Sequence, residues 1–192
     1  MTEKEKMMAG DWYDANFDKG LLAERIRVKD FCFDFNNARP SEVDLRAELL
    51  KKILPSVEVT AVEILSPFVV DYGFNIRIGA GSFFNHGCYL MDCAPITFGS
   101  HCFVGPSCEF YTAIHPLIAE ERNKGLERAE AITIGDDVWL GGGVIVMPGV
   151  TIGAGSVIGA GSVVTKNIPS GMIAFGNPCR VVRPVVDRML TV

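Results

Sequence analysis

The sequence predicts an all-β fold, a parallel β-helix of hexapeptide repeats with a helical cap before it and one extruded loop. The first observation is a six-residue repeat that fills most of the C-terminal half of the chain. The second is that glycine recurs at fixed places in the repeat, where it would destabilise an α-helix. The third is a charged stretch at which the repeat stops and then resumes. Together they indicate a solenoid of short strands and turns.

The repeat is clearest between residues 134 and 169, which divide into hexads. They read "IGDDVW", "LGGGVI", "VMPGVT", "IGAGSV", "IGAGSV" and "VTKNIP". An aliphatic residue leads each hexad: Ile134, Leu140, Val146, Ile152, Ile158 and Val164. A small or branched residue stands fifth: Val138, Val144, Val150, Ser156, Ser162 and Ile168. Three hexads make one triangular coil, so we expect the leading side chain to point inside and the fifth to face a tighter space there.

Earlier hexads keep the same pattern. They start at Tyr72, Ile78 and Phe84, and after a two-residue slip at Phe98, Val104 and Phe110. Between Ile114 and Ile134 the pattern fails for about three hexads, in the charged segment "AEERNKGLERAE". We therefore predict a loop at about 115–131. In the preceding hexad "FYTAIH" we expect Phe110 and Ile114 to point inward, which would fix His115 at a corner of the coil.

The two ends of the chain lack the repeat. Residues 1–55 predict a helical cap, in which Ser41 and Asp44 have the spacing of a capping box before a leucine-rich stripe. The β-helix is predicted over 56–175, and the tail 176–192 is expected to pack on it.

Composition excludes several classes of protein. A net charge of −5 and a pI of about 5.2 argue against general nucleic-acid binding. Residues from Val138 to Thr165 carry no charge and are numerous enough to span a bilayer, but their glycines and Pro148 suit a helix poorly. The polar N-terminus lacks the apolar core of a signal peptide, so we expect a cytoplasmic protein without membrane segments.

The six cysteines are expected to be reduced thiols. Cys88, Cys102 and Cys108 take the fifth place of their hexads and are interpreted as small core residues. No metal-ligand spacing is present among the cysteines, and the three histidines take different places in their hexads. We therefore expect no metal and no disulfide.

Longer motifs resemble a known family. The leader "EKMMAGDWYDANFDKGLLAERIRVKDFCFDFN", the tetrapeptide "IHPL", and the stretch from "ITIGDDVWLGGG" to "GNPCRVVR" are similar to the maltose and galactoside O-acetyltransferases, a group of hexapeptide-repeat acyltransferases. The resemblance implies a left-handed winding and a homotrimer with active sites between subunits. It also implies acetyl-CoA as co-substrate and a small sugar as acceptor.

The same resemblance implies roles for single residues. His115 would be the catalytic base, Asn85 would lie beside the acceptor hydroxyl, and Glu127 would meet His115 from the loop. The acceptor-binding positions would be Asp14, Asp71, Phe83 and Asp92, where phenylalanine replaces a tyrosine of some members at 83. The positions that contact coenzyme A would be Trp139, Gly141, Gly142, Ala160, Thr165, Lys166, Arg180 and Arg183.

The residue types suit this chemistry, although simpler interpretations stay open. Histidine titrates near neutral pH and can take the proton of a hydroxyl that attacks a thioester, and an N–H near Gly141–Gly142 could stabilise the oxyanion. His115 could instead be an exposed residue at a strand end. Trp139 could serve a subunit interface, and the loop charges and the basic C-terminal residues could be ordinary surface charges.

Three functions are therefore carried forward. The first is transfer of an acetyl group from acetyl-CoA to a sugar hydroxyl, expected at the 6-position, by direct attack. The second keeps acetyl-CoA but uses a non-sugar acceptor such as an antibiotic. The third is a non-catalytic β-helix that acts as a scaffold.

Overall fold

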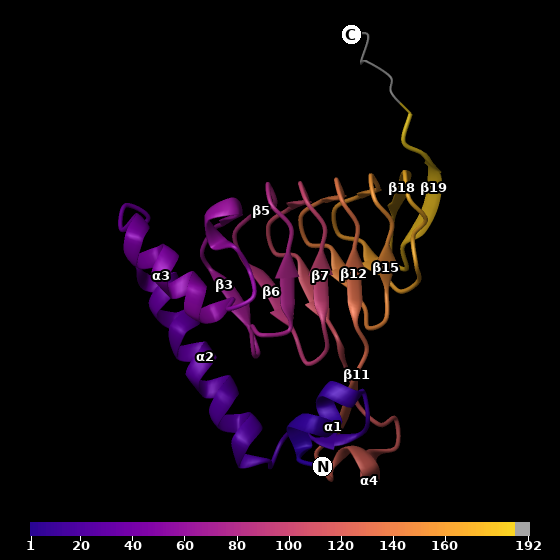
Figure 1. The fold of residues 1–192 in the computed structure, drawn as a ribbon. Helices are drawn as coiled ribbons and strands as arrows, with labels where there is room; N and C mark the ends of the chain where they lie inside the picture. Colours follow the sequence, from indigo (N-terminus) through magenta and orange to yellow (C-terminus); the bar gives the residue numbers. More distant parts are fainter. Residues whose placement is uncertain (187–192) are drawn as a thin grey trace.

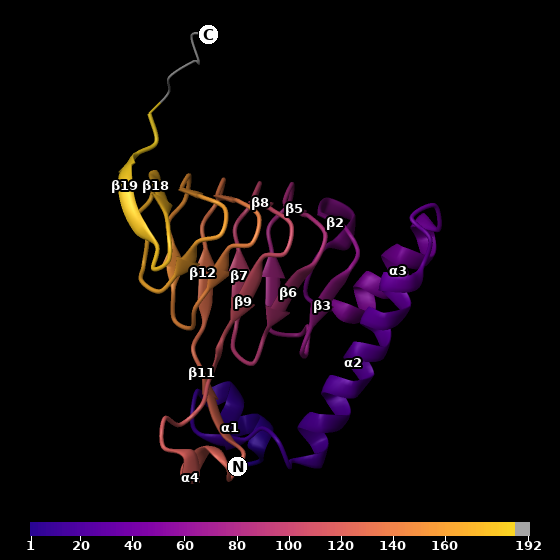
Figure 2. The ribbon, with the colours of Figure 1, turned by 180° about the vertical axis from the view of Figure 1, so that it is seen from behind.

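The computed structural model describes residues 1–186, and its main body is a triangular prism of stacked coils (Figures 1 and 2). Within these residues three sheets make up its faces. The first sheet contains β2 (Glu63–Ile64), β5 (Phe83–Phe84), β8 (Phe103–Val104), β13 (Trp139–Leu140), β16 (Val157–Ile158), β18 (Met172–Phe175) and β19 (Arg180–Pro184). The second contains β3 (Phe68–Val70), β6 (Cys88–Met91), β9 (Glu109–Tyr111), β14 (Ile145–Val146) and β17 (Val163–Val164). The third contains β4 (Ile76–Ile78), β7 (Ile96–Phe98), β12 (Ile132–Ile134) and β15 (Thr151–Ile152).

The prism is a left-handed parallel β-helix, and the predicted fold class is confirmed. Strand pairing explains each irregularity of the repeat. Leu140 pairs with Ile158, 18 positions later, so three hexads make one coil. Phe84 pairs with Val104, 20 positions later, and this coil contains the two-residue slip. Val104 pairs with Leu140 across 36 positions, because the extruded segment adds the length of one coil without entering the prism.

The interior of the prism matches the hexad pattern. The leading residues from Ile134 to Val164 are all buried, with exposed fractions of 0–1%. The fifth-place residues are buried too, and Cys88, Cys102 and Cys108 lie among them as the core residues expected. All six cysteines are free and buried. Because each coil places its side chains on those of the next, the core is one continuous column.

In most hexads the fourth place is a corner with left-handed backbone. Gly143 and Gly161 have φ values of 69° and 70° there, a conformation that costs glycine little. His101 occupies the same place with a φ of 55°, and Asp137 does so as well. The corner therefore belongs to the coil geometry, and glycine is the residue that adopts it with the least strain.

Helices cover the first coil of the prism. Two helices, α2 (Lys19–Asn37) and α3 (Val43–Ile53), bury Phe35, Leu49 and Ile53 against the same core as the first strands, and the short helix η1 (Val59–Ala61) follows. The proposed capping box at Ser41 is wrong, because α3 has Glu42 as its N-cap and no side chain bonds to its first turn. Asp18 caps α2 instead.

The extruded segment is a hairpin that the N-terminus completes. Its strands are β10 (Ala113–Ile114) and β11 (Leu126–Ala129), with the helix α4 (Ala119–Arg122) between them. After the first helix, α1 (Glu3–Ala9), strand β1 (Tyr13–Asp14) pairs antiparallel with β11. All of these elements lie together below the prism in Figure 1.

The hairpin corrects the expected surroundings of His115. The chain leaves the prism after β9, so Ile114 pairs with Arg128 of the hairpin and is only partly buried. His115 therefore lies on the extruded hairpin and not at a corner of a coil. The reason is that Ala113 and Ile114, which directly precede His115, pair with β11 before the coil can close.

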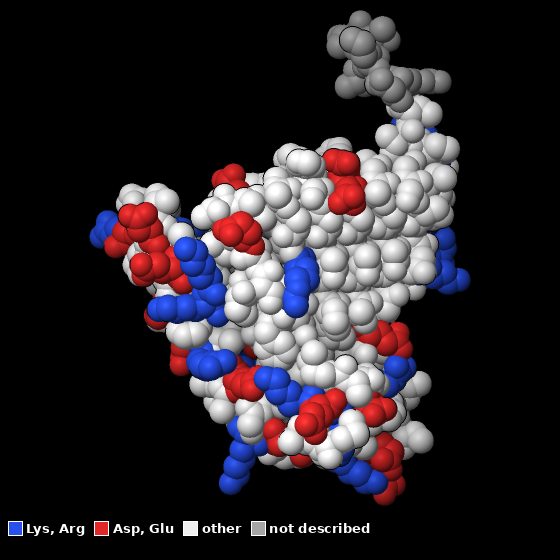
Figure 3. Space-filling model, viewed as in Figure 1, with Lys and Arg blue, Asp and Glu red and all other residues white. Residues whose placement is uncertain are grey.

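The end of the prism away from α2 and α3 carries the hairpin of β18 and β19 (Figure 1). The predicted tail 176–192 is described only as far as residue 186. No helix within the described residues is both long and apolar enough to cross a membrane. Charged side chains gather on the helices and the extruded hairpin, whereas the prism face in Figure 3 is largely uncharged.

Candidate active site

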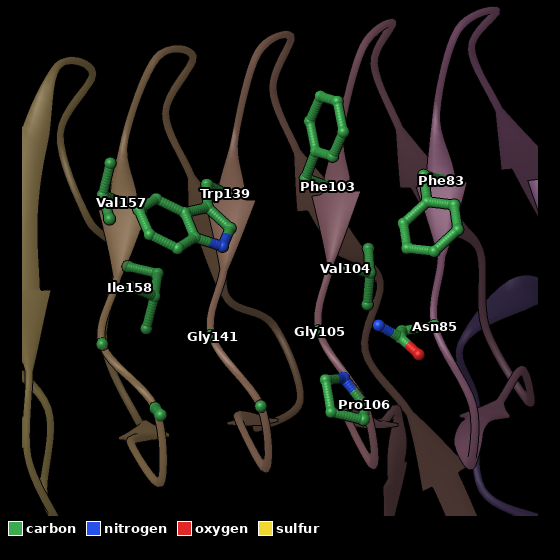
Figure 4. A pocket seen from close by; sticks show the side chains of 13 residues that line it. Phe83, Asn85, Phe103, Val104, Gly105, Pro106, Trp139, Gly141, Val157 and Ile158 are labelled. Atoms are coloured by element: carbon green, nitrogen blue, oxygen red, sulfur yellow. The ribbon is translucent and has the colours of Figure 1, made fainter.

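A groove of about 550 Å³ runs along the first sheet of the prism and crosses successive coils. Phe83, Phe103, Trp139 and Val157 project outward from successive strands along it, as Figure 4 shows. These are the sixth-place residues of their hexads, which alternate with the buried leading residues. Trp139 is 57% exposed in the single chain. The groove is thus an open, mostly apolar channel of a size typical for small-molecule sites.

Glycines and one asparagine make up the other edge of the groove. Gly141 approaches the next coil so closely that a Cβ there would lie 2.6 Å from the backbone nitrogen of Ala160. At Gly142 a Cβ would lie 3.2 Å from the ring of Pro106 and 3.4 Å from the carbonyl oxygen of the same residue. Ala160 lines the same groove. Asn85 does so as well (Figure 4). Five of the predicted coenzyme and catalytic positions therefore meet here: Asn85, Trp139, Gly141, Gly142 and Ala160.

The basic positions predicted to contact coenzyme A lie outside this lining. Arg180 and Arg183 are exposed on β19, which pairs with β18 next to the groove strand β16. Thr165 and Lys166 are exposed just after β17, on another face of the prism. Among the described residues, the groove of a single chain is therefore lined by the apolar positions of the predicted coenzyme site, and the predicted basic positions lie outside it.

His115 and Glu127 meet on the extruded hairpin. Nδ1 of His115 donates a hydrogen bond to the carbonyl oxygen of Leu126, at 3.2 Å. This contact fixes the proton of the neutral ring on Nδ1 and leaves the lone pair on Nε2. Nε2 lies 3.6 Å from Oε2 of Glu127, whose side chain is 10% exposed against 46% for His115. That distance is too long for a hydrogen bond, but it sets the carboxylate directly beside the imidazole ring.

Asp14 lies close to this pair, on β1. Its backbone is opposite Leu126. Its carboxylate accepts hydrogen bonds from the backbone N–H groups of Asn16 and Phe17, at 3.2 and 2.9 Å. These contacts make a turn that leads into α2, and they occupy Oδ1. Only the other carboxylate oxygen, Oδ2, could form a hydrogen bond to an acceptor substrate.

Asp71 directly follows β3 in the first coil, and Asp92 directly follows β6 in the second. Oδ1 of Asp71 accepts from the hydroxyl of Tyr89 at 3.0 Å and lies 3.2 Å from the ammonium group of Lys29. Asp92 is fully buried. Its carboxylate accepts backbone N–H groups of three residues, at 2.7 to 3.3 Å: Asp71, Tyr72 and Asn75.

The geometry therefore gives Asp92 a different role from the predicted one. It holds the backbone that carries Asp71, and it has no surface for an acceptor. Burial raises the pKa of Asp92 to about 7, although its backbone hydrogen bonds act in the opposite direction. This residue is part of the frame of the site.

The sequence analysis did not identify the side chains that hold Glu127 and Asp71. Tyr13 donates a hydrogen bond from its hydroxyl to Glu127. Lys29 and Tyr89 hold Asp71 in the same way. The only sequence signal was that Tyr13 precedes Asp14, because the pairing of β1 with β11 spans more than a hundred residues. No cluster of three or more His, Cys, Asp or Glu side chains suited to a metal occurs among the described residues.

Two family models match the chain. The maltose acetyltransferase hexapeptide capping motif matches residues 6–58, which contain most of the N-terminal helical part. The bacterial transferase hexapeptide, a model of six repeats, matches residues 131–166. Both matched segments border the groove or the hairpin described above.

Whole-chain comparisons extend this similarity. A protein of Staphylococcus haemolyticus named "Putative acetyltransferase" is 55% identical over 185 residues, covering 96% of either chain. The structure of a maltose O-acetyltransferase from Clostridium difficile has a TM-score of 0.92 at 42% identity, covering 97% of this chain and 99% of the other. A galactoside acetyltransferase in complex with coenzyme A has a TM-score of 0.88 at 37% identity, covering 98% and 93%.

The chain belongs to the maltose and galactoside O-acetyltransferase family. It is an acetyltransferase, and its co-substrate is acetyl-CoA. A hexapeptide-repeat acetyltransferase of Vibrio cholerae, 34% identical with a TM-score of 0.86, was solved with acetyl-CoA and covers 97% of this chain.

The groove fits such a co-substrate in this member of the O-acetyltransferase family. Its outward aromatic and aliphatic side chains offer an apolar wall to a long, thin pantetheine arm. Gly142 leaves space beside Pro106 on the opposite edge. Arg180 and Arg183 lie on the adjoining hairpin, where guanidinium groups can meet phosphates.

Proposed function

We propose that the protein transfers the acetyl group of acetyl-CoA to a hydroxyl group of a small sugar, such as maltose, glucose or a galactoside, with His115 as general base. The observation that carries the proposal is the orientation of His115. Its Nδ1 proton is committed to the carbonyl of Leu126, and Nε2 keeps its lone pair beside the carboxylate of Glu127. A histidine held in this way is prepared to accept one proton.

The proposed reaction is a direct acyl transfer. The acceptor hydroxyl, expected at the 6-position of the sugar, gives its proton to Nε2 as its oxygen bonds to the thioester carbonyl carbon. The imidazolium is stabilised by Glu127, and an N–H near Gly141–Gly142 stabilises the oxyanion. The carbon–sulfur bond then breaks, and the proton passes from Nε2 to the leaving thiolate. Because no thiol of the described chain is exposed, the proposal needs no covalent enzyme intermediate.

The proposal includes a homotrimer with active sites between subunits. Asn85 lies in the groove of the prism, while His115 lies on the hairpin and does not line that groove in the described chain. A neighbouring subunit would bring the two residues together. Asp71 and Asp14 would then contact the sugar, and Phe83 would form an apolar wall. We place this enzyme in the cytoplasm, which suits six unpaired thiols.

The test is the variant His115→Ala, assayed by release of free coenzyme A with a panel of sugars. The variant should keep the thermal stability of the wild type and lose about 10²- to 10⁴-fold in kcat, because general-base catalysis contributes that much. A rate near that of the wild type at saturating substrate would contradict the mechanism. A wild-type enzyme that acetylates amines or antibiotics but none of the sugars would contradict the acceptor class.

A further inference from the structure

We infer that Tyr13 is a positioning residue that holds Glu127 in place beside the proposed base His115. The inference rests on the proposed function, and it assigns to the N-terminal strand a role in the chemistry. Tyr13 does not line the groove, and its side chain is fully buried in the single chain. It would therefore act through Glu127 and not on the acceptor.

The register of the small sheet places the three side chains in one row. On β1 and β11, Tyr13 lies directly opposite Glu127. On β10 and β11, Ile114 lies opposite Arg128, so the next position in the antiparallel register sets His115 opposite Glu127. Directly opposed residues share one face of a sheet. The hairpin strands β10 and β11, together with the distant strand β1, thus align the proposed base, the carboxylate and the phenol.

The contacts within this row have a direction. The hydroxyl of Tyr13 donates to Oε1 of Glu127, and the other oxygen, Oε2, is the one that lies 3.6 Å from His115 Nε2. A carboxylate held at one oxygen cannot turn freely, so the second oxygen keeps its position next to the imidazole. Burial raises the pKa of Tyr13 far above its ordinary value, so the phenol remains a hydrogen-bond donor at any working pH.

The same strand also fixes the second contact of His115. Asp14 pairs with Leu126, whose carbonyl oxygen accepts the Nδ1 proton of His115. The N–H of Ala15 donates to the carbonyl of Gly125, at 3.1 Å. Strand β1 therefore supports both groups that orient the base, one through its backbone and one through the Tyr13 hydroxyl. Only the second can be removed by a side-chain substitution.

Tyr13→Phe removes this hydroxyl and retains the buried ring. We expect kcat to fall about tenfold, the effect of losing one hydrogen bond to a charged group, while KM for acetyl-CoA changes less than about twofold. The matched control is Tyr72→Phe. Tyr72 is buried in the same cluster, but its hydroxyl accepts from Arg25 at 2.7 Å and does not touch Glu127. Its kcat should stay within about twofold of the wild type.

A double-mutant cycle separates positioning from a general effect on the fold. In a Glu127→Gln background, which has lost the carboxylate, Tyr13→Phe should lower kcat by less than about twofold. An equal loss in both backgrounds, or a wild-type kcat for Tyr13→Phe, would overturn the inference. Thermal unfolding of every variant verifies that the proteins compared are folded.

Failure of this inference can be told apart from failure of the proposed function. If His115→Ala is inactive and Tyr13→Phe has full kcat, the role of Tyr13 alone is wrong. If His115→Ala keeps its activity, the proposed base is wrong and the role of Tyr13 falls with it. If both lose kcat and the cycle is non-additive, the hydroxyl acts through Glu127 as inferred.

Discussion

At the scale of single residues, buried carboxylates divide into two kinds. Glu127 uses one oxygen for Tyr13 and turns the other towards His115, the proposed base. Asp92 uses both oxygens for backbone N–H groups and is closed off from solvent. Two acidic residues near one site thus differ in role because they differ in what their second oxygen meets.

Asp92 makes stability depend on pH. Its pKa rises from 3.8 towards about 7 in the folded protein, mainly through burial. Between these values the folded state binds a proton that the unfolded state does not, so its contribution to stability falls as pH rises, by up to about 1.4 kcal/mol per pH unit. Urea denaturation at pH 5, 6 and 7 should show this slope in the wild type and a flatter one in Asp92→Asn.

The control for this prediction is Asp30→Asn, which changes an exposed aspartate of α2. It should keep the slope of the wild type. The prediction fails if the wild type and Asp92→Asn show the same change in unfolding free energy between pH 5 and 7. That result would mean that the Asp92 carboxylate does not bind a proton in this range.

At the scale of elements, the hexad explains why glycine occupies two places for two different reasons. In the second place the backbone of the next coil lies against the Cα atom, whereas in the fourth place the backbone turns with a positive φ. Gly153 and Gly155 show both cases in the single hexad "IGAGSV". A Cβ at Gly153 would collide with the backbone of Ser170, whereas no described atom lies within 4 Å of one at Gly155.

We therefore predict unequal effects of two alanine substitutions. Gly153→Ala should lower the free energy of unfolding by about 3 kcal/mol, because backbone atoms of the next coil must move. Gly155→Ala should cost only about 1 kcal/mol, the strain of a left-handed alanine. Denaturant unfolding measures both. Equal losses would mean that contact between coils does not determine the second place.

The sequence predicted the prism well and the site only in part. Each coil repeats a local pattern, and its partners lie one coil away, so spacing alone indicated the buried and the outward residues such as Leu140 and Trp139. The sheet of β1, β11 and β10 has no repeat and joins segments far apart in the chain. No local pattern encodes that pairing, which is why the place of His115 was mispredicted and Tyr13 was missed.

At the scale of the whole molecule, the apolar groove and most of the charged side chains lie on different parts of the chain. The prism supplies an apolar groove and very few charges, while the hairpin and the helices carry most of the charged side chains in view in Figure 3. The proposed base lies on the hairpin and the proposed partner Asn85 on the prism. A complete site then depends on how subunits assemble.

Co-assembly tests this arrangement. Two inactive variants, His115→Ala and Asn85→Ala, are unfolded together and refolded as mixed oligomers. If each site takes His115 from one subunit and Asn85 from another, random mixing at equal amounts restores about a quarter of the wild-type sites. If both residues come from one subunit, every site keeps one defect and no activity returns. Refolding each variant alone is the control.

Strand β1 has a consequence for how the protein is made. Strand β1 leaves the ribosome well before its partner β11, which begins at Leu126. During synthesis β1 therefore stays without its strand partner until more than a hundred further residues have been added. The pairing that orients the proposed base His115 therefore cannot form until Leu126–Ala129 have been made, and a chain that stalls before residue 126 holds the first coils without this small sheet.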